Sequence, residues 1–375
     1  MKHHLRSFSK GNGTMRIVTR PDFDGIVCAV LLYAVETIDQ PVKWVSPNDM
    51  QKNRVDIQKN DIIANLPYNE NCSLWFDHHF SNQLRYPVPG LFRIAPSAAG
   101  VVFEHYQDHL KDRFTELIQE TDKIDAAQLS LDEILQPEKY PFVLLSMTIY
   151  PHVANDEPYW NHLIELLRDS TIQGVLNDPE VRKRCDAVIE ENKEYKDLLK
   201  AYTTTREHIS ITDFRSLEKA PYGNRFLIYS LFPETSVSIK ISFSDEDKET
   251  VVVKVGHSIL NRTCNVNVGQ MLSYFEGGGH KGAGACRFHY SLVDDYLSKI
   301  FDILLENDPD GSIVVITERS DTDRRSVKDR RHKSPIDYLE AGGRERRKKT
   351  NRRSGGEQRK DWKRTDQWQS RRVPE

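Results

Sequence analysis

The sequence is poor in cysteine and has no long apolar run, and both shortages exclude whole classes of protein. It holds five cysteines in 375 residues, none of them in a CxxC pair. Such a set predicts reduced thiols in the cytoplasm and excludes a disulfide framework. No apolar stretch approaches the roughly 18–20 residues that cross a bilayer, and residues 1–14 lack the apolar core of an export signal. We therefore expect a cytoplasmic protein without a membrane span.

The net charge of −3 conceals an uneven distribution of charge along the chain. Residues 318–375 hold 20 basic and 11 acidic side chains, which leaves 33 basic and 45 acidic ones in residues 1–317. The tail therefore has a net charge of +9, whereas the body has a net charge of −12. The hydrophobic share of 38% is enough for a packed core in the body.

The first half of the body predicts an α/β fold. Strand patterns at 15–19, 42–45, 61–65 and 73–76 alternate with helical segments at 26–35 and after Ser97, a plausible helix cap. This alternation is typical of a parallel sheet with helices on both faces. Polar clusters at 20–25, 65–68 and 77–79 follow three of the strands. Ligands of such sheets bind at the carboxyl ends of strands, so these clusters indicate a site.

The second half predicts a different organisation. A charged, helix-prone segment precedes strand patterns at 208–214, 225–232, 237–244 and 250–256, a glycine-dense loop at 277–284 and a closing helix over 292–304. We predict an N-terminal extension (1–14), a catalytic domain (15–178), a helical linker (179–205), a smaller α+β domain (206–310) and a disordered basic tail (311–375).

Two polar motifs carry side chains that bind divalent cations in proteins. Asp22 and Asp24 follow the first strand, and in an extended segment both carboxylates would point to one side. Hard divalent cations prefer several oxygen ligands, so the pair is half of a metal site or, alternatively, a DxDG turn. Asp77-His78-His79 follows another strand. Adjacent residues alternate faces, so one histidine would bind metal while the other faces substrate; the alternative is a solvated polar loop.

Two further segments contain candidate site residues, but they indicate a site only in combination with these motifs. Asp122 and Asp125 lie near a helical segment, where the alternative is ordinary surface charge. The run Gly277-Gly-Gly-His280 lets the backbone approach a ligand closely and present N–H groups to an anion. For this run the alternative is a flexible hairpin loop.

Taken together, the motifs resemble those of the DHH phosphoesterases that carry a DHH-associated C-terminal domain. The resemblance covers residues 15–307 and keeps the family order of Arg20-Pro-Asp-Phe-Asp-Gly25, Trp75-Phe-Asp-His-His79, Thr121-Asp-Lys-Ile-Asp125 and Gly277-Gly-Gly-His280. Asn65-Leu-Pro-Tyr68, which precedes the second motif, looks most like a branch described as exopolyphosphatase-related.

The resemblance implies metal-assisted phosphoryl hydrolysis, with two Mn²⁺ or Mg²⁺ ions that share a bridging water. Carried over to this sequence, Asp22 would bind the first ion. The second ion would be bound by Asp24, His78 and an aspartate of the third motif. Asp122 matches the family's Thr-Asp pair best, and Asp125 is the alternate.

The same resemblance implies the catalytic and substrate-binding residues. His79, beside Asp77, would face the substrate phosphate as an acid or a charge stabiliser. The C-terminal domain would close over the cleft and hold the far phosphate or nucleotide. Its predicted contacts are Arg262, Gly277, Gly278, Gly279 and His280.

Two residues depart from the family pattern. Many members have a metal-binding histidine in the neighbourhood of Arg20, and an aspartate that bridges both ions where this sequence has Asn65. Asp61 is nearby but starts its predicted strand, far from the carboxyl end. The first metal site therefore has fewer anionic ligands and an added positive charge, and Arg20 becomes a candidate for binding substrate phosphate. One ion, or none, is the alternative to two.

The basic tail predicts a second contact with polyanions. Arg-Arg pairs recur from 324–325 to 371–372, and Trp362 and Trp368 lie among basic residues. Basic side chains attract phosphate and interleaved aromatic rings stack on bases, which is typical of nucleic-acid or polyanion binding by residues 318–375. The alternative is a solvated, partly charge-balanced tail without a partner.

The predicted function is metal-dependent hydrolysis of a phosphodiester or phosphoanhydride bond. The predicted substrates are short oligonucleotides, nucleotides, cyclic dinucleotides or short polyphosphate. The alternative is a regulatory protein of the same fold that binds a phosphate ligand or nucleotide but has lost hydrolysis, and Arg20 and Asn65 are the reasons to consider it.

Overall fold

The computed structural model describes residues 15–150 and 156–308. The predicted extension (1–14) and the whole of the predicted tail (311–375) lie outside these described residues, and the predicted domain boundaries stay predictions. Within the described ranges, no helix combines the length and the apolar character that a membrane crossing requires.

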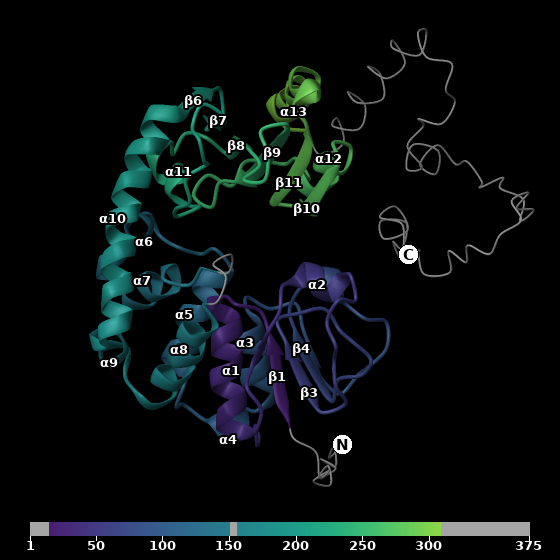
Figure 1. Cartoon of the computed structure of the whole chain (residues 1–375), viewed down its shortest axis with the longest axis vertical. Coiled ribbons are helices and arrows are strands. Elements are labelled where there is room, and N and C mark those ends of the chain that lie inside the picture. Colours follow the sequence, from purple (N-terminus) through teal and green to yellow (C-terminus); the bar gives the residue numbers. More distant parts are fainter. Residues whose placement is uncertain (1–14, 151–155, 309–375) are drawn as a thin grey trace, which may run out of the picture. The chain divides into compact units, whose positions relative to one another are not determined.

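The first sheet is parallel throughout, which confirms the predicted α/β fold class. Its strand order is β2-β1-β3-β4-β5. The strands are β1 (Arg16–Thr19), β2 (Lys43–Trp44), β3 (Asp61–Ala64), β4 (Leu74–Asp77) and β5 (Gly90–Phe92). Strands β1, β3 and β4 end beside one another, and each is followed by one of the predicted polar clusters (Figure 1).

The two faces of this sheet are packed by different elements because side chains alternate along a strand. Ile17, Ile62 and Phe76 belong to the core that includes α1 (Phe23–Val35) and α3 (Ala98–His105). Their chain neighbours Val18, Ile63 and Trp75 pack on the other side with Met50 of α2 (Pro47–Gln51). The prediction of helices on both faces is therefore confirmed.

Helix α1 begins at Phe23, three residues before the predicted start. Asp22 is in extended backbone and caps the helix, because its Oδ1 accepts the N–H of Gly25 at 2.9 Å. Asp24 consequently lies in the first helical turn. The prediction of an extended segment that aims both carboxylates to one side is wrong, since the start of a helix positions them instead.

A series of helices follows the first sheet and its two helices. They are α4 (Gln107–Leu110), α5 (Thr115–Asp125), α6 (Leu131–Leu135), α7 (Pro141–Met147), α8 (Glu157–Asp169) and α9 (Ile172–Asn177). Trp160, Leu163 and Ile164 of α8 pack into the same core as α1.

Helix α10 (Pro179–Tyr202) forms most of the predicted linker. Asp178 caps it by accepting the N–H groups of Glu180 and Val181 at 3.0 and 3.2 Å, and Pro179 occupies the first helical position. The predicted linker runs to residue 205, but β6 (Thr203–Arg206) already begins at Thr203. Three consecutive β-branched threonines favour a strand there.

The second sheet is mixed and has the strand order β10-β11-β9-β8-β7-β6. Its remaining strands are β7 (Ile209–Asp213), β8 (Val237–Phe243), β9 (Thr250–His257), β10 (Gly277–His280) and β11 (Ala283–His289). Strand β8 runs parallel to β7 and antiparallel to β9. Helices α12 (Val268–Ser273) and α13 (Val293–Glu306) complete this α+β part, and α13 confirms the predicted closing helix.

Two predictions in this part are wrong. The strand predicted at 225–232 is replaced by helix α11 (Leu227–Leu231). A short apolar run fits a buried helix turn as well as a strand, so periodicity alone cannot separate them. The glycine run, for which the sequence predicts a loop, forms edge strand β10, with Gly277 paired to Cys286 across the hairpin.

The first motif contains a glycine that packing leaves without room for a side chain. A Cβ at Gly25 would lie 2.1 Å from the carbonyl oxygen of Arg20 and 2.8 Å from Oγ1 of Thr19. We expect Gly25→Ala to lower the free energy of unfolding by about 3 kcal/mol, measured by urea titration. Gly278→Ala is the control, because nothing lies within 4 Å of a Cβ there. Equal midpoints for the two variants would contradict the expectation.

Candidate metal centre

His78 follows strand β4 and presents a nitrogen that lacks a hydrogen-bond partner among the described residues. Its Nδ1 lies 3.0 Å from the carbonyl oxygen of Ala95. Because a carbonyl only accepts, Nδ1 carries the proton and Nε2 of the neutral ring carries a lone pair. This Nε2 is buried and has no partner in the described part of the chain. It lies 3.8 Å from Oδ2 of Asp24 and 3.4 Å from Oδ2 of Asp125.

Asp24 is buried in the first turn of α1 and is held by a second helix. Its two carboxylate oxygens accept the N–H groups of Ala98 and Ala99, at 2.9 and 2.8 Å, at the start of α3. Burial, followed by the charges of Asp125 and Asp22, raises the pKa of Asp24 well above its ordinary value despite these two hydrogen bonds. Without a cation, this carboxylate is in an unfavourable environment.

The structure separates the two aspartates of the third motif. Asp125, the last residue of α5, reaches His78, and its carboxylate oxygen belongs to a group with Asp24 and His78 whose ligand atoms lie within 4.8 Å of one another. Asp122, one turn earlier, accepts a 2.6 Å hydrogen bond from Oγ of Ser97. The sequence favoured Asp122, but the geometry brings its alternate Asp125 to the histidine.

Burial also raises the pKa of Asp125, and the charge of Asp22 adds to the effect. Two buried carboxylates beside an imidazole lone pair form an arrangement that a divalent cation would stabilise, since it neutralises both charges and satisfies the nitrogen. The donor set of one nitrogen and carboxylate oxygens suits Mn²⁺, which accepts oxygen ligands and imidazole. The residues present therefore fit the metal that the family implies.

The neighbouring Asp22 has a different environment. Its Oδ2 lies 2.5 Å from Nε of Arg20, and its Oδ1 accepts the side-chain amide of Asn65 at 3.1 Å in addition to the N–H of Gly25. Asn65 follows β3 with a φ of 57°, a left-handed conformation that asparagine tolerates. Its Oδ1 is buried without a hydrogen-bond partner among the described residues. Asp61, at the other end of β3, is paired with Arg16.

Asp77 and His79 form a second acidic–imidazole pair at the end of β4. The fully buried carboxylate of Asp77 lies 2.8 Å from Nδ1 of His79 and accepts the amide of Asn82 at 2.6 Å. The carboxylate thereby fixes the ring of His79 and favours a proton on Nδ1. Asp77, His78 and His79 also lie close enough for a metal, but His79 and Asn82 already occupy both oxygens of Asp77.

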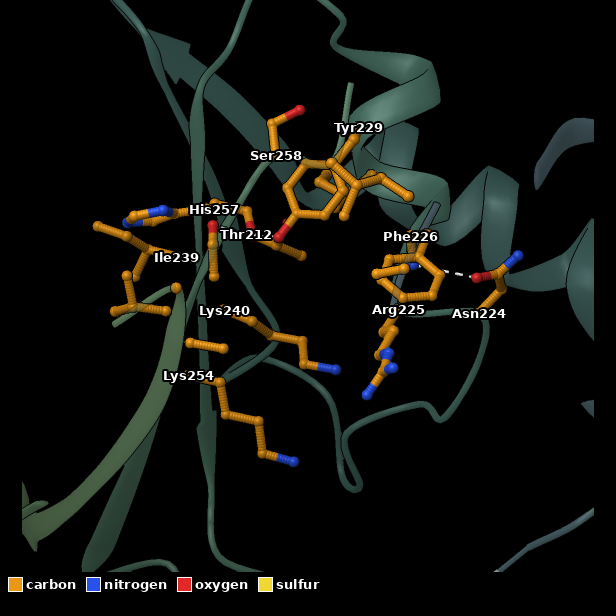
Figure 2. A pocket seen from close by; sticks show the side chains of 18 of the residues that line it. Thr212, Asn224, Arg225, Phe226, Tyr229, Ile239, Lys240, Lys254, His257 and Ser258 are labelled. Atoms are coloured by element: carbon orange, nitrogen blue, oxygen red, sulfur yellow. Dashed lines mark hydrogen bonds between the residues drawn. The ribbon is translucent and has the colours of Figure 1, made fainter. Parts of the chain in front are cut away.

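A cavity of about 440 Å³ opens at the candidate metal centre, and its lining includes Arg20, Asp22, Asp24 and Asp125. A second cavity of about 610 Å³ lies on the second sheet and is shown in Figure 2. Residues 224–226 line both cavities. Sequence reasoning missed these three residues, because the strand predicted at 225–232 offered no reason to place them at a site.

Of the predicted substrate-binding residues in the second part of the chain, some line the larger cavity and others do not. Arg262 lines the larger cavity and donates to the carbonyl oxygens of Ile259 and Ala127 at 3.1 and 3.4 Å. The lining continues with residues 282–285 rather than with Gly277, Gly278 and Gly279, which lie in β10. The side chain of His280 lies outside the described part of the structure.

Comparison with known proteins places this arrangement in a family. No model of a protein family and no curated protein sequence matches the chain. The pGpG-specific phosphodiesterase PggH from Vibrio cholerae matches it in structure with a TM-score of 0.68 and 31% identity, over 79% of this chain and 100% of PggH. This chain belongs to the DHH phosphoesterase family.

A more distant similarity within the DHH family concerns the fold alone. The DHH domain of a protein described as a member of a family of ribosomal proteins matches with a TM-score of 0.50 and 12% identity, over 76% of this chain and 85% of that one. The exopolyphosphatase-related branch stays a prediction.

Proposed function

We propose that this DHH-family protein is a metal-dependent phosphodiesterase that hydrolyses dinucleotides and similarly short oligonucleotides. The observation that carries the proposal is the buried Nε2 of His78, which has two carboxylates within 3.8 Å and no hydrogen-bond partner in the described residues. Asp24, His78 and Asp125 would hold the metal. When bound, a divalent ion supplies a Lewis acid for the phosphoryl group and for the attacking water.

Asp77 and His79 would handle the proton of the leaving group. The buried carboxylate of Asp77 orients the ring through Nδ1. Nε2 of His79 would then give its proton to the ester oxygen as the bond between that oxygen and phosphorus breaks. The oxygen of water takes the vacated place on phosphorus, and the water gives up a proton to the solvent, from which Nε2 of His79 is protonated again. One nucleotide therefore leaves with a hydroxyl and the other with a phosphate.

Arg20 favours one divalent ion over the two that the resemblance implies. Oδ1 of Asp22 already accepts two hydrogen bonds from this chain and Oδ2 forms an ion pair with Arg20, so a cation at Asp22 would compete with the guanidinium. The guanidinium is a fixed positive charge with several donors, which suits an oxygen of the scissile phosphate. We therefore infer one ion per chain, with Arg20 as the second positive charge.

The substrate class rests on the similarity to PggH, which extends over the whole of that chain. PggH is a phosphodiesterase specific for pGpG, a linear dinucleotide with a 5′-phosphate. The larger cavity supports a substrate of this kind, since its volume of about 610 Å³ falls in the range of small-molecule sites, about 300–1,000 Å³. Aromatic residues, on which a nucleobase can stack, line it as well.

The proposal is tested with the purified full chain, by chromatography of the products of pGpG, GpG and inorganic polyphosphate. We expect hydrolysis of the dinucleotides with Mn²⁺, loss of activity in EDTA, recovery on adding Mn²⁺, and one Mn²⁺ per chain by elemental mass spectrometry. Tight nucleotide binding without turnover in Mn²⁺ would favour the regulatory alternative. Hydrolysis of polyphosphate alone would contradict the substrate class.

A further inference from the structure

The second sheet holds two lysines directly opposite each other. Lys240 of β8 and Lys254 of β9 are register partners, so their side chains share one face of the sheet. Like charges in this position destabilise a sheet, and a carboxylate between them would normally offset the repulsion. Among the described residues, neither lysine has an ion pair, and no aspartate or glutamate lines the cavity into which both face. The repulsion is therefore not offset within this part of the chain.

Burial strengthens the case for an external anion. Burial first, and then the charge of Lys254, lowers the pKa of Lys240 to about 8. Its amine donates to the hydroxyl of Tyr195 at 3.5 Å and lies 5.9 Å from the centroid of the Tyr195 ring. A phenol and an aromatic ring compensate a partly buried ammonium only weakly. The ammonium thus has room for a negatively charged ligand.

A third cation completes the cluster. Arg225 lines the same cavity, and Figure 2 shows its guanidinium and the amine of Lys240 extending toward the same space from opposite walls. Arg225 stacks on the ring of Phe226, with its central carbon 4.6 Å from the ring centroid. This stacking holds the guanidinium in place and leaves its N–H groups available to a phosphate.

The remaining wall of the cavity is apolar and aromatic. It is formed by Leu199, Phe226, Ile228, Tyr229, Ile239 and Val255. Such a surface suits a base or a ribose, whereas an inorganic polyphosphate has no apolar part that would use it. The combination of three cations and an apolar wall therefore indicates a nucleotide.

We propose that Lys240, Lys254 and Arg225 bind the terminal 5′-phosphate of a short oligonucleotide whose nucleoside packs against the apolar wall. The inference rests on the proposed function and names the recognition element of its substrate. A terminal phosphate monoester carries a charge close to −2 at pH 7, whereas an internal diester carries −1. Three cations match the terminal group better, so the cluster selects 5′-phosphorylated over unphosphorylated ends.

The test is calorimetric titration of the full chain with pGpG and GpG in EDTA, where hydrolysis cannot interfere. We expect the unmodified chain to bind pGpG at least about tenfold more tightly than GpG, as charge-assisted hydrogen bonds allow. In Lys240→Gln and Lys254→Gln, the preference should fall below about threefold while the affinity for GpG changes less than about twofold. Because Lys254 is exposed, Lys254→Gln is expected to fold normally. It therefore tests the inference even if Lys240→Gln misfolds.

Lys193→Gln is the matched control, since this lysine is exposed on α10 and does not line the cavity. A preference that survives in both cavity variants, or an equal loss of affinity for both dinucleotides, would overturn the inference. Tripolyphosphate that competes as well as pGpG would overturn the assignment to a nucleotide. Discrimination that depends on Lys254 without any turnover in Mn²⁺ would overturn the proposed function alone.

The pH profile gives an independent readout. Besides Lys240, the charged and titratable groups that line the cavity are Tyr195, Arg225, Tyr229, Lys254, His257 and Arg262. Burial raises the pKa of Tyr195 to about 12 and lowers that of His257, so neither changes charge between pH 7 and 9. Lys240 loses its proton as the pH rises through about 8. We expect the preference for pGpG over GpG to fall between pH 7 and 9 in the unmodified chain. In Lys240→Gln the preference should not change with pH over this range.

Discussion

Replacing His78 with alanine is expected to lower kcat/KM for dinucleotide hydrolysis by about a thousandfold or more, because the substitution removes a metal ligand. The lone pair on Nε2 is the one nitrogen donor in the group with Asp24 and Asp125. The affinity for Mn²⁺, measured by calorimetry, should fall in parallel with activity. Loss of the hydrogen bond to Ala95 has a smaller effect, about 1 kcal/mol of stability.

The control for this variant is His109→Ala, because His109 lies exposed on α4 and outside both metal-ligand groups. It should retain full activity and full affinity for Mn²⁺. If His78→Ala folds, as judged by its thermal transition, and hydrolyses pGpG at the unmodified rate, then the proposed centre is wrong.

The second large effect is expected from Asp125→Asn, compared with Asp122→Asn. Asp125 faces His78, so its loss should weaken Mn²⁺ binding at least about a hundredfold and lower turnover accordingly. Asp122 is bonded to Ser97, the cap of α3, and asparagine keeps an acceptor for that hydroxyl. We expect Asp122→Asn to cost at most about 1 kcal/mol of stability and to bind Mn²⁺ normally.

Titration of the two variants with Mn²⁺ under identical conditions decides between the aspartates. The reverse result, with normal affinity in Asp125→Asn and a large loss in Asp122→Asn, would restore the assignment that the sequence favoured. Equal losses in both would indicate that Asp122 acts on the centre through Ser97 and α3. Urea unfolding of each variant separates an effect on the metal from an effect on the fold.

The sequence alone could not predict which of Asp122 and Asp125 faces His78. Residues three apart on a helix share a face, so both carboxylates point in a similar direction from α5. The choice between them depends on the position of Ser97, which caps α3 and takes Asp122 as its acceptor. No local pattern encodes that distance, because 25 residues separate the two side chains.

The wrong predictions in the second part of the chain have a similar origin. The apolar residues of 227–231 are compatible with either a strand or a helical turn, and contacts with the core that includes Phe214 and Tyr195 favour the helix. The glycine run has weak intrinsic preference for a strand, but hydrogen bonding to β11 makes it one. In both places, tertiary contacts outweigh a weak local signal.

The sequence by itself determined the parallel sheet, the family and the polar clusters, because apolar strands followed by polar residues bring those residues to one edge of the sheet. Only the tertiary structure decided which carboxylate oxygens lie near His78 and that Arg20 forms an ion pair with Asp22. It also decided that Lys240 and Lys254 are register partners and line the same cavity as Arg225. These facts are distances between elements remote in sequence. They follow from packing and strand register, which local residue patterns do not specify.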